Sequence, residues 1–273
     1  MFRYEALPGF FAQDDPLADP AVIGAVPARF GLLDSSETRW SNLTSKLREL
    51  NTIDASSSYK LIFFGRHGQG YHNVAETKYG TKAWDDYWAK LYGDGELTWG
   101  PDPELTSVGK DQATDVSKIW KAELAAHIPL PDRLYCSPMT RAMQTNVITF
   151  AELPLPTVVI LENCREEYGE HTCDKRNTRT YIQNKFPHFD IEAGFTEEDE
   201  LWDADVRETA AHAVIRAESV LDRIFREDTN TLVVSITAHG GIINGFLRAL
   251  GRSRYALPTG GVVPVVVKAT KSA

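Results

Sequence analysis

The 273-residue sequence predicts an α/β protein, a three-layer α/β/α sandwich in which helices cover both faces of a mainly parallel central sheet. Short apolar runs of strand length recur along the chain, and segments with helical spacing of apolar residues lie between them. Strands that alternate with helices are typical of parallel sheets, because each helix returns the chain to the start of the next strand. The length suits one large domain, so we expect residues 59–273 to form the main domain and residues 1–58 an N-terminal extension that packs on its core.

Each element has its own signal in the sequence. Apolar runs rich in β-branched and aromatic residues predict strands at 59–64, 133–136, 158–161, 231–237 and 262–267. Apolar residues spaced three or four apart predict helices at 40–50, 106–127, 141–153, 206–226 and 241–250. Proline, glycine and aspartate mark residues 1–20 as loop. Pro264 suggests that the last strand lies at a sheet edge, because proline has no N–H to donate to a neighbouring strand.

The composition restricts the partners. The chain has 29 Lys and Arg against 38 Asp and Glu, and a net charge of −9 disfavours nucleic acid and anionic membranes as partners. Its longest apolar runs have strand length and are too short to cross a bilayer. Three scattered cysteines and an N-terminus without a signal-peptide pattern predict a cytoplasmic protein. A small anionic molecule stays possible as the partner, because a site can be locally basic on an acidic protein.

Charged and nucleophilic side chains follow four of the predicted strands. They are Arg66 and His67 after the first strand, Arg141 after the second, Glu166 and Glu167 after the third, and His239 after the fourth. In open α/β sheets, ligands bind outside the carboxyl ends of the strands. We therefore expect these side chains to converge on one edge of the sheet.

Such a set suits phosphoryl transfer through a covalent histidine. A neutral imidazole can attack phosphorus, and arginines hold phosphoryl oxygens through charge-assisted hydrogen bonds. A carboxylic acid can protonate the leaving oxygen and then, as a carboxylate, activate water. Gly68 and Gly240 lie beside the two histidines, where their backbone N–H groups can approach a phosphate closely, and His72 can line the same pocket. Metal-ligand spacings and nucleotide-binding glycine motifs are absent from the sequence, so we predict neither a metal nor a cofactor.

Other enzyme classes are less well supported. Cys136 precedes Arg141 by one residue too few for the Cys-x5-Arg loop of cysteine phosphatases, and no glycine-rich anion loop lies between them. His239-Gly240-Gly241 is similar to the oxyanion segment of α/β-hydrolases, but the sequence has no Gly-x-Ser-x-Gly nucleophile elbow. A phosphate-binding protein with a decayed active site would have lost some of the arginines and histidines listed above, and all of them remain.

Motifs in the same region occur in a familiar order. Residues 61–68 (LIFFGRHG) precede Asn73, and the later blocks are residues 105–109 (LTSVG), Ser137-Pro138 with Arg141, and Ala238-His239-Gly240. Together they resemble the signature of the histidine phosphatase (phosphoglycerate mutase-like) superfamily, over roughly residues 59–250. The resemblance implies a phosphoglycerate mutase-like fold with His67 as the phosphorylated nucleophile. It also implies that Arg66, Arg141 and His239 form the phosphate pocket and that Asn73 is a supporting contact.

The acid–base residue departs from the usual family pattern. The family's glutamate lies four residues before a glycine, and this chain has Arg165 at that position. Residues 164–176 (CREEYGEHTCDKR) instead resemble a variant of plant and fungal phosphoglycerate mutase-like proteins, in which Glu166 takes the acid's role. Glu167 is the second choice, and Arg176 can touch the distal part of the substrate. The N-terminal Pro8-Gly9 segment further resembles a fungal phosphomutase-like subgroup.

These inferences predict a metal-independent phosphatase that hydrolyses a small organic phosphate or diphosphate ester through a phosphohistidine intermediate. A phosphoglycerate-type phosphomutase and an inactive phosphate-ligand-binding protein are the alternatives. Residues 73–104 and 169–205 are expected to form a lid, and their many aromatic side chains favour a bulky or apolar substrate.

Overall fold

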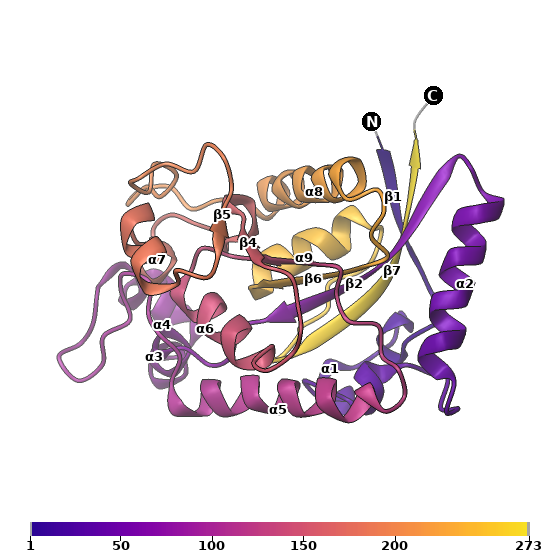
Figure 1. Ribbon diagram of the computed structural model, residues 1–273. Coiled ribbons are helices and arrows are strands. Elements are labelled where there is room, and N and C mark those ends of the chain that lie inside the picture. The colour runs from indigo at the N-terminus through magenta and orange to yellow at the C-terminus, as the bar shows by residue number, and fades with distance from the viewer. Residues whose placement is uncertain (1, 272–273) are drawn as a thin grey trace.

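A computed structural model describes residues 2–271 and contains one seven-stranded sheet. The strand order across the sheet is β1-β7-β2-β6-β3-β4-β5 (Figure 1). In chain order the strands are β1 (Phe2–Leu7), β2 (Ser57–Arg66), β3 (Arg133–Cys136), β4 (Val158–Ile160), β5 (Asp190–Ile191), β6 (Val233–Ala238) and β7 (Val262–Lys271). From β2 through β6, β3 and β4 to β5 all neighbours are parallel, whereas β7 is antiparallel to both β1 and β2. The prediction of a mainly parallel sheet is confirmed.

Helices cover both faces of this sheet (Figure 1). They are α1 (Pro20–Ile23), α2 (Arg39–Ile53), α3 (Tyr71–Tyr79), α4 (Thr81–Asp86), α5 (Ser107–Leu124), α6 (Thr140–Thr149), α7 (Arg179–Lys185), α8 (Ala210–Glu227) and α9 (Gly240–Ala249). Side chains alternate between the two faces along a strand. Ile62 and Phe64 of β2 accordingly pack with α8 and α9, and Leu61 and Phe63 pack with α2 and α5. The three-layer architecture is therefore confirmed, and burial on both faces explains why β2 reads as a continuous apolar run.

The N-terminal residues differ from the loop that was expected. Residues 2–7 form β1, which pairs with β7 along its whole length. Alternate side chains of β1, those of Phe2, Tyr4 and Ala6, pack against the core under α8 and α9. This alternation is visible in the sequence, but the prolines and glycines that follow it favour a loop.

The prediction that Pro264 marks an edge strand is wrong, because β7 lies between β1 and β2. The register gives the reason. The β1 pairing stops at Val266, opposite Leu7, whereas Pro264 lies opposite Phe63 of β2. At Pro264 the strand therefore has a neighbour on one side only, and a residue without an N–H is tolerated there.

The parallel strands bring the site together. The carboxyl ends of β2, β3, β4 and β6 lie at the same edge of the sheet, and α3, α4 and α7 gather beyond that edge (Figure 1). Between residues 2 and 271, no helix is both long enough and apolar enough to span a lipid bilayer.

Candidate active site

His67 lies directly after β2 and is 1% exposed. Its Nδ1 atom is 2.7 Å from the carbonyl oxygen of Gly68. Because a carbonyl can only accept, Nδ1 carries the ring proton and Nε2 keeps its lone pair. Burial, together with the charges of Arg141 and Arg66, holds the pKa of His67 well below its ordinary value. The imidazole is therefore neutral at pH 7 and has the tautomer that a nucleophile attacking through Nε2 requires.

Two further imidazoles surround this ring. The ring centroid of His239 is 4.9 Å from that of His67, and the centroid of His72 is 5.4 Å away. His239 Nε2 is 2.7 Å from the Ser137 hydroxyl, and its Nδ1 is buried with no partner among the described residues. Burial and the nearby Arg141 charge also lower the pKa of both His72 and His239 well below the usual range. The structure thus brings the two predicted histidines and His72 into one buried cluster.

Two arginines complete the cluster, and each is held from behind. Arg66 donates from Nη1 to the Leu257 carbonyl at 2.7 Å. Arg141 donates from Nη1 to the Cys173 carbonyl and from Nη2 to Asp174, both at 2.8 Å. The Nε atoms of Arg66 and Arg141 are buried and have no partner in the described part of the chain. Since buried polar groups are normally hydrogen-bonded, these donors around a free imidazole nitrogen indicate a pocket for an anion.

Glu166 lies at the N-terminus of α9, beside this pocket. Its carboxylate accepts from the N–H groups of Gly241 at 3.1 Å and Ile242 at 3.2 Å. A Cβ atom on Gly241 would lie 2.2 Å from Glu166 Oε1, so the close approach of the carboxylate requires glycine. Burial raises the pKa of the neighbouring Glu167, and the charge of Glu166 adds to that effect. Both glutamates therefore reach the site.

An open cavity leads away from this cluster. It has a volume of about 860 Å³, and its walls include Arg66, Glu166, Glu167, Gly240 and Arg207. Gly240 is the first residue of α9, so its N–H has no intrahelical acceptor. Of the cluster residues, Arg66 forms part of the cavity wall, so the cavity adjoins the buried cluster at Arg66.

Three predicted contacts have other roles in the structure. The Gly68 N–H donates to the Thr145 hydroxyl at 3.0 Å and is not free for a phosphate. Asn73 Oδ1 accepts from the Gly70 N–H at 3.0 Å and caps the start of α3. Arg176 donates to Glu162 and to backbone carbonyls between residues 177 and 198, and these bonds occupy Nε, Nη1 and Nη2. The expectation that Arg176 touches the substrate is corrected accordingly, because its guanidinium forms hydrogen bonds that hold the loop at residues 196–198.

The aromatic side chains of residues 73–104, expected to form part of a lid over the substrate, do not line the cavity. Trp84 and Trp99 are buried in a separate small core with Cys173, and the Trp88 ring stacks on Tyr79 with centroids 3.9 Å apart. None of these aromatic side chains lines the cavity that opens from Arg66. They stabilise the segment that follows α3, so they give no support for a bulky apolar substrate.

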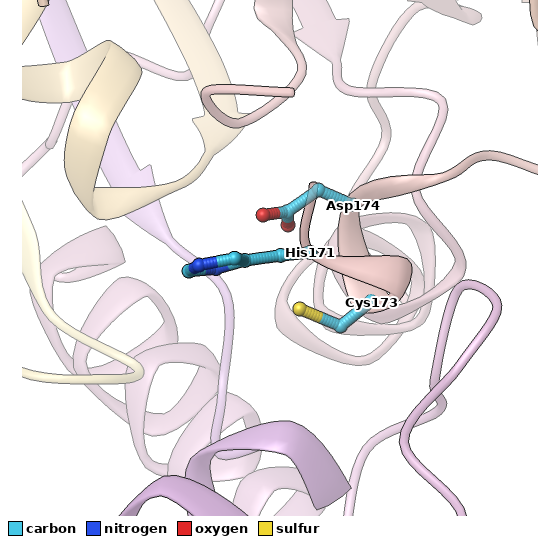
Figure 2. Close-up of side chains that lie close together, drawn as sticks. All are labelled: His171, Cys173 and Asp174. Carbon is cyan, nitrogen blue, oxygen red and sulfur yellow. The ribbon is translucent and has the colours of Figure 1, made fainter. Parts of the chain in front are cut away.

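Figure 2 shows His171, Cys173 and Asp174, whose side chains project in the same direction from one segment. Their potential ligand atoms lie within 4.8 Å of one another, as metal ligands would. The two carboxylate oxygens of Asp174, however, pair with Arg141 and Arg207, both at 2.8 Å. Burial also holds the pKa of the Cys173 thiol well above its usual range, so the thiolate that binds metal is disfavoured. Two arginines and a protonated thiol make this a poor site for a cation.

Asp174 instead positions Arg141. The sequence motifs singled out neither Asp174 nor Arg207 as part of the site, because their partners come from distant segments of the chain. The only available signal was the position of Asp174 within the CDKR block.

Comparison with known proteins shows which family this chain resembles. A family model described as "Histidine phosphatase superfamily (branch 1)" matches residues 89–259, which include Arg141 and His239, and His67 lies before that range. "Probable phosphoglycerate mutase" of Arthroderma benhamiae is 42% identical, over 97% of this chain and 84% of its own length. "Phosphomutase-like protein 3" of Candida albicans is 36% identical, over 97% of this chain and 80% of its own length. The ecdysone phosphate phosphatase of Bombix mori shares the fold at a TM-score of 0.50, with 15% identity over 75% of this chain and 88% of that one.

Proposed function

The chain belongs to the histidine phosphatase superfamily, and from this premise we propose that it is a metal-independent phosphatase of a small organic phosphate ester. One observation carries the proposal. His67 presents a free Nε2 to a pocket in which Arg66 Nε, Arg141 Nε and His239 Nδ1 are buried without partners. An anion there would accept from the Nε–H groups of both arginines at once, and it would place its central atom beside the nucleophile.

The proposed reaction has two steps. His67 Nε2 attacks phosphorus, the bond between phosphorus and the ester oxygen breaks, and the leaving oxygen takes a proton from Glu166. Water then attacks the phosphohistidine and gives a proton to Glu166, and the bond between phosphorus and nitrogen breaks to release phosphate. Arg66 and Arg141 balance the charge on the phosphoryl oxygens in both steps.

Glu166 is the proposed acid and base, and Glu167 is the alternative. Glu166 is preferred, because its carboxylate accepts from the Gly241 N–H at the start of α9, next to Gly240 of the cavity wall. Glu167 lines the same cavity, and burial raises its pKa, which favours a carboxyl group that can hold a proton. Measuring kcat for Glu166→Gln and Glu167→Gln separates the two, because the variant that lacks the acid should lose about 100-fold or more.

A phosphomutase is the second candidate, because two relatives are named for that activity. A mutase must keep water away from the phosphoenzyme, whereas this cavity reaches the surface at the exposed residues Arg248 and Arg254. Access of water favours hydrolysis. Incubation with 3-phosphoglycerate distinguishes the two activities by the appearance of either 2-phosphoglycerate or inorganic phosphate.

The decisive experiment measures phosphate release from a panel of alkyl, sugar and aryl phosphates. We expect His67→Ala to abolish release and to prevent trapping of an acid-labile, base-stable phosphoenzyme. The control is His188→Ala, because His188 is exposed on the segment after α7. Full activity in His67→Ala would exclude the covalent mechanism. We further propose that the enzyme acts in the cytoplasm on small phosphorylated molecules, and not on nucleic acid or membranes, in keeping with its net charge of −9.

A further inference from the structure

The cavity beside the active site is positive, although the chain as a whole is acidic. Its walls carry five arginines and two glutamates, a formal charge of +3 in a chain whose net charge is −9. Arg66 and Arg207 contact the site already described. The other three arginines are Arg248, at the end of α9, and Arg252 and Arg254, in the loop that follows. None of these three has a role in holding the transferred phosphoryl group.

Two of the three arginines are free to bind a ligand. Of these three arginines, only Arg252 has a carboxylate of residues 2–271 in salt-bridge range, since its Nη1 is 3.6 Å from Asp14 Oδ1. Arg252 also donates from Nη2 to the Gln13 carbonyl, which fixes it to the N-terminal segment. Arg248 and Arg254 are exposed at the cavity wall and have neither an ion pair nor a side-chain hydrogen bond in the same part of the chain.

The loop that carries these arginines is held in place. The Tyr255 N–H donates to Asn244 Oδ1 of α9 at 2.8 Å, and the Arg252 N–H donates to the Leu247 carbonyl at 2.8 Å. At the end of the loop, the Leu257 carbonyl accepts from Arg66 of the active site. Backbone positions in the loop are thus set relative to the phosphoryl pocket before any ligand binds, which lowers the entropic cost of binding.

The geometry of α9 sets the spacing between the two ends of the cavity. Arg248 follows Gly240 by eight residues, so its Cα lies about 12 Å along the helix from the N-terminus at the phosphoryl pocket. Side chains on a helix lean toward its N-terminus, which favours an anion bound by Arg248 on the phosphoryl-pocket side of its Cα. An anion bound there would lie on the order of 10 Å from the transferred phosphorus. The two phosphorus atoms of a diphosphate are much closer together than that.

We propose that the substrate carries a second phosphate, bound by Arg248 and Arg254 about two helical turns from the phosphate that His67 attacks. The substrate class is a small bisphosphate with one phosphate ester at each end of a chain of about six atoms. This inference rests on the proposed phosphatase activity, and it sharpens the expectation of a phosphate or diphosphate ester. Arg252 takes a supporting part, because Asp14 already balances much of its charge.

The test compares three substrates that share a six-carbon chain: hexyl phosphate, hexyl diphosphate and hexane-1,6-diol bisphosphate. We expect the wild-type protein to have the highest kcat/KM for the bisphosphate. In the double variant Arg248→Gln/Arg254→Gln, kcat/KM for the bisphosphate should fall about 10- to 100-fold, the effect of losing hydrogen bonds to a charged group. Hexyl phosphate should change less than about twofold, because it reaches only the phosphoryl pocket.

Arg3→Gln/Arg48→Gln is the matched control, because Arg3 on β1 and Arg48 on α2 are both exposed and their loss removes two positive charges, as the double variant does. An equal loss for hexyl phosphate and the bisphosphate in the double variant would overturn the inference and indicate a general electrostatic effect. If wild-type kcat/KM for hexyl diphosphate exceeded that for hexyl phosphate as much as the bisphosphate value does, the proposed spacing of two helical turns between the phosphates would be wrong.

Binding is measured separately, by calorimetric titration of the same three compounds into His67→Ala and into His67→Ala/Arg248→Gln/Arg254→Gln. A preference for the bisphosphate that the arginine substitutions remove supports the second phosphate site, even where no compound is hydrolysed. Absence of any such preference overturns it. Failure of hydrolysis by wild type, with the binding preference intact, would instead refute the proposed phosphatase activity.

Discussion

The buried histidine cluster predicts a steep loss of stability in mild acid. Burial and the charge of Arg141 hold the pKa values of His67, His72 and His239 well below 6.5 in the folded protein. In the unfolded chain each titrates near 6.5, so below that pH the unfolded state binds more protons and the free energy of unfolding falls. On acidification from pH 7.5 to 5.5, each histidine that stays neutral in the folded protein lowers the free energy of unfolding by about 1.4 kcal/mol. The three together lower it by about 4 kcal/mol.

His72→Gln isolates one share of this effect. Urea unfolding at pH 7.5 and 5.5 measures how much stability each protein loses on acidification. We expect His72→Gln to lose about 1.4 kcal/mol less than wild type, whatever its stability at pH 7.5. Carboxyl groups with raised pKa values, such as that of Glu167, act in the opposite direction but contribute to both proteins, so they cancel in the comparison. Equal losses in the two proteins would show that His72 is protonated in the folded state and would refute this account. The control His188→Gln, at an exposed position, should lose as much stability as wild type.

Two further predictions concern groups that hold the catalytic residues. Asp174→Asn removes the charge that pairs with buried Arg141, so urea unfolding should show a loss of about 3 kcal/mol, and the inhibition constant of inorganic phosphate should rise. An unchanged inhibition constant would contradict a positioning role for Asp174. Gly241→Ala places a methyl group 2.2 Å from the present position of Glu166 Oε1, so the carboxylate must move. We expect kcat to fall by about tenfold or more while phosphate inhibition stays within about twofold of wild type, and a normal kcat would argue against Glu166 as the acid.

The sequence predicts the central strands and their catalytic ends well, for a physical reason. Strands β2 and β6 are buried on both faces, so residues 61–64 of β2 form a continuous apolar run, and β6 combines apolar residues with only the small polar Ser235 and Thr237. His67, Arg141 and His239 each follow the carboxyl end of a strand. Because these parallel strands end at one edge of the sheet, their positions in the sequence predict that the three residues lie close together. In the structure the ring centroids of His67 and His239 lie 4.9 Å apart, and burial and the charge of Arg141 lower the pKa of both.

Residues that depend on contacts between distant segments are not predictable in this way. Arg176 stands only two residues after Asp174, yet it holds the loop at residues 196–198, whereas Asp174 reaches Arg141. Both are buried and charged, and only the path of the chain decides which of them serves the site. Likewise, the aromatic side chains of Trp84 and Trp99 are of a type that often lines a substrate site, but they pack into a separate small hydrophobic core.

The unpartnered polar groups that define the pocket also lower the stability of the folded protein when no ligand is bound. A buried donor without an acceptor lowers stability by about 1 to 3 kcal/mol, and Arg66 and Arg141 each contribute one through Nε. Nothing in the fold requires this arrangement, because a nearby carboxylate could satisfy an arginine, as Asp174 does on the other side of Arg141. A carboxylate in the pocket would, however, raise the pKa of His67 and occupy the position of the phosphoryl oxygens. The absence of an acid in contact with these donors among residues 2–271 therefore keeps the imidazole neutral and leaves the pocket to an incoming anion, at a cost in stability that the rest of the core must offset.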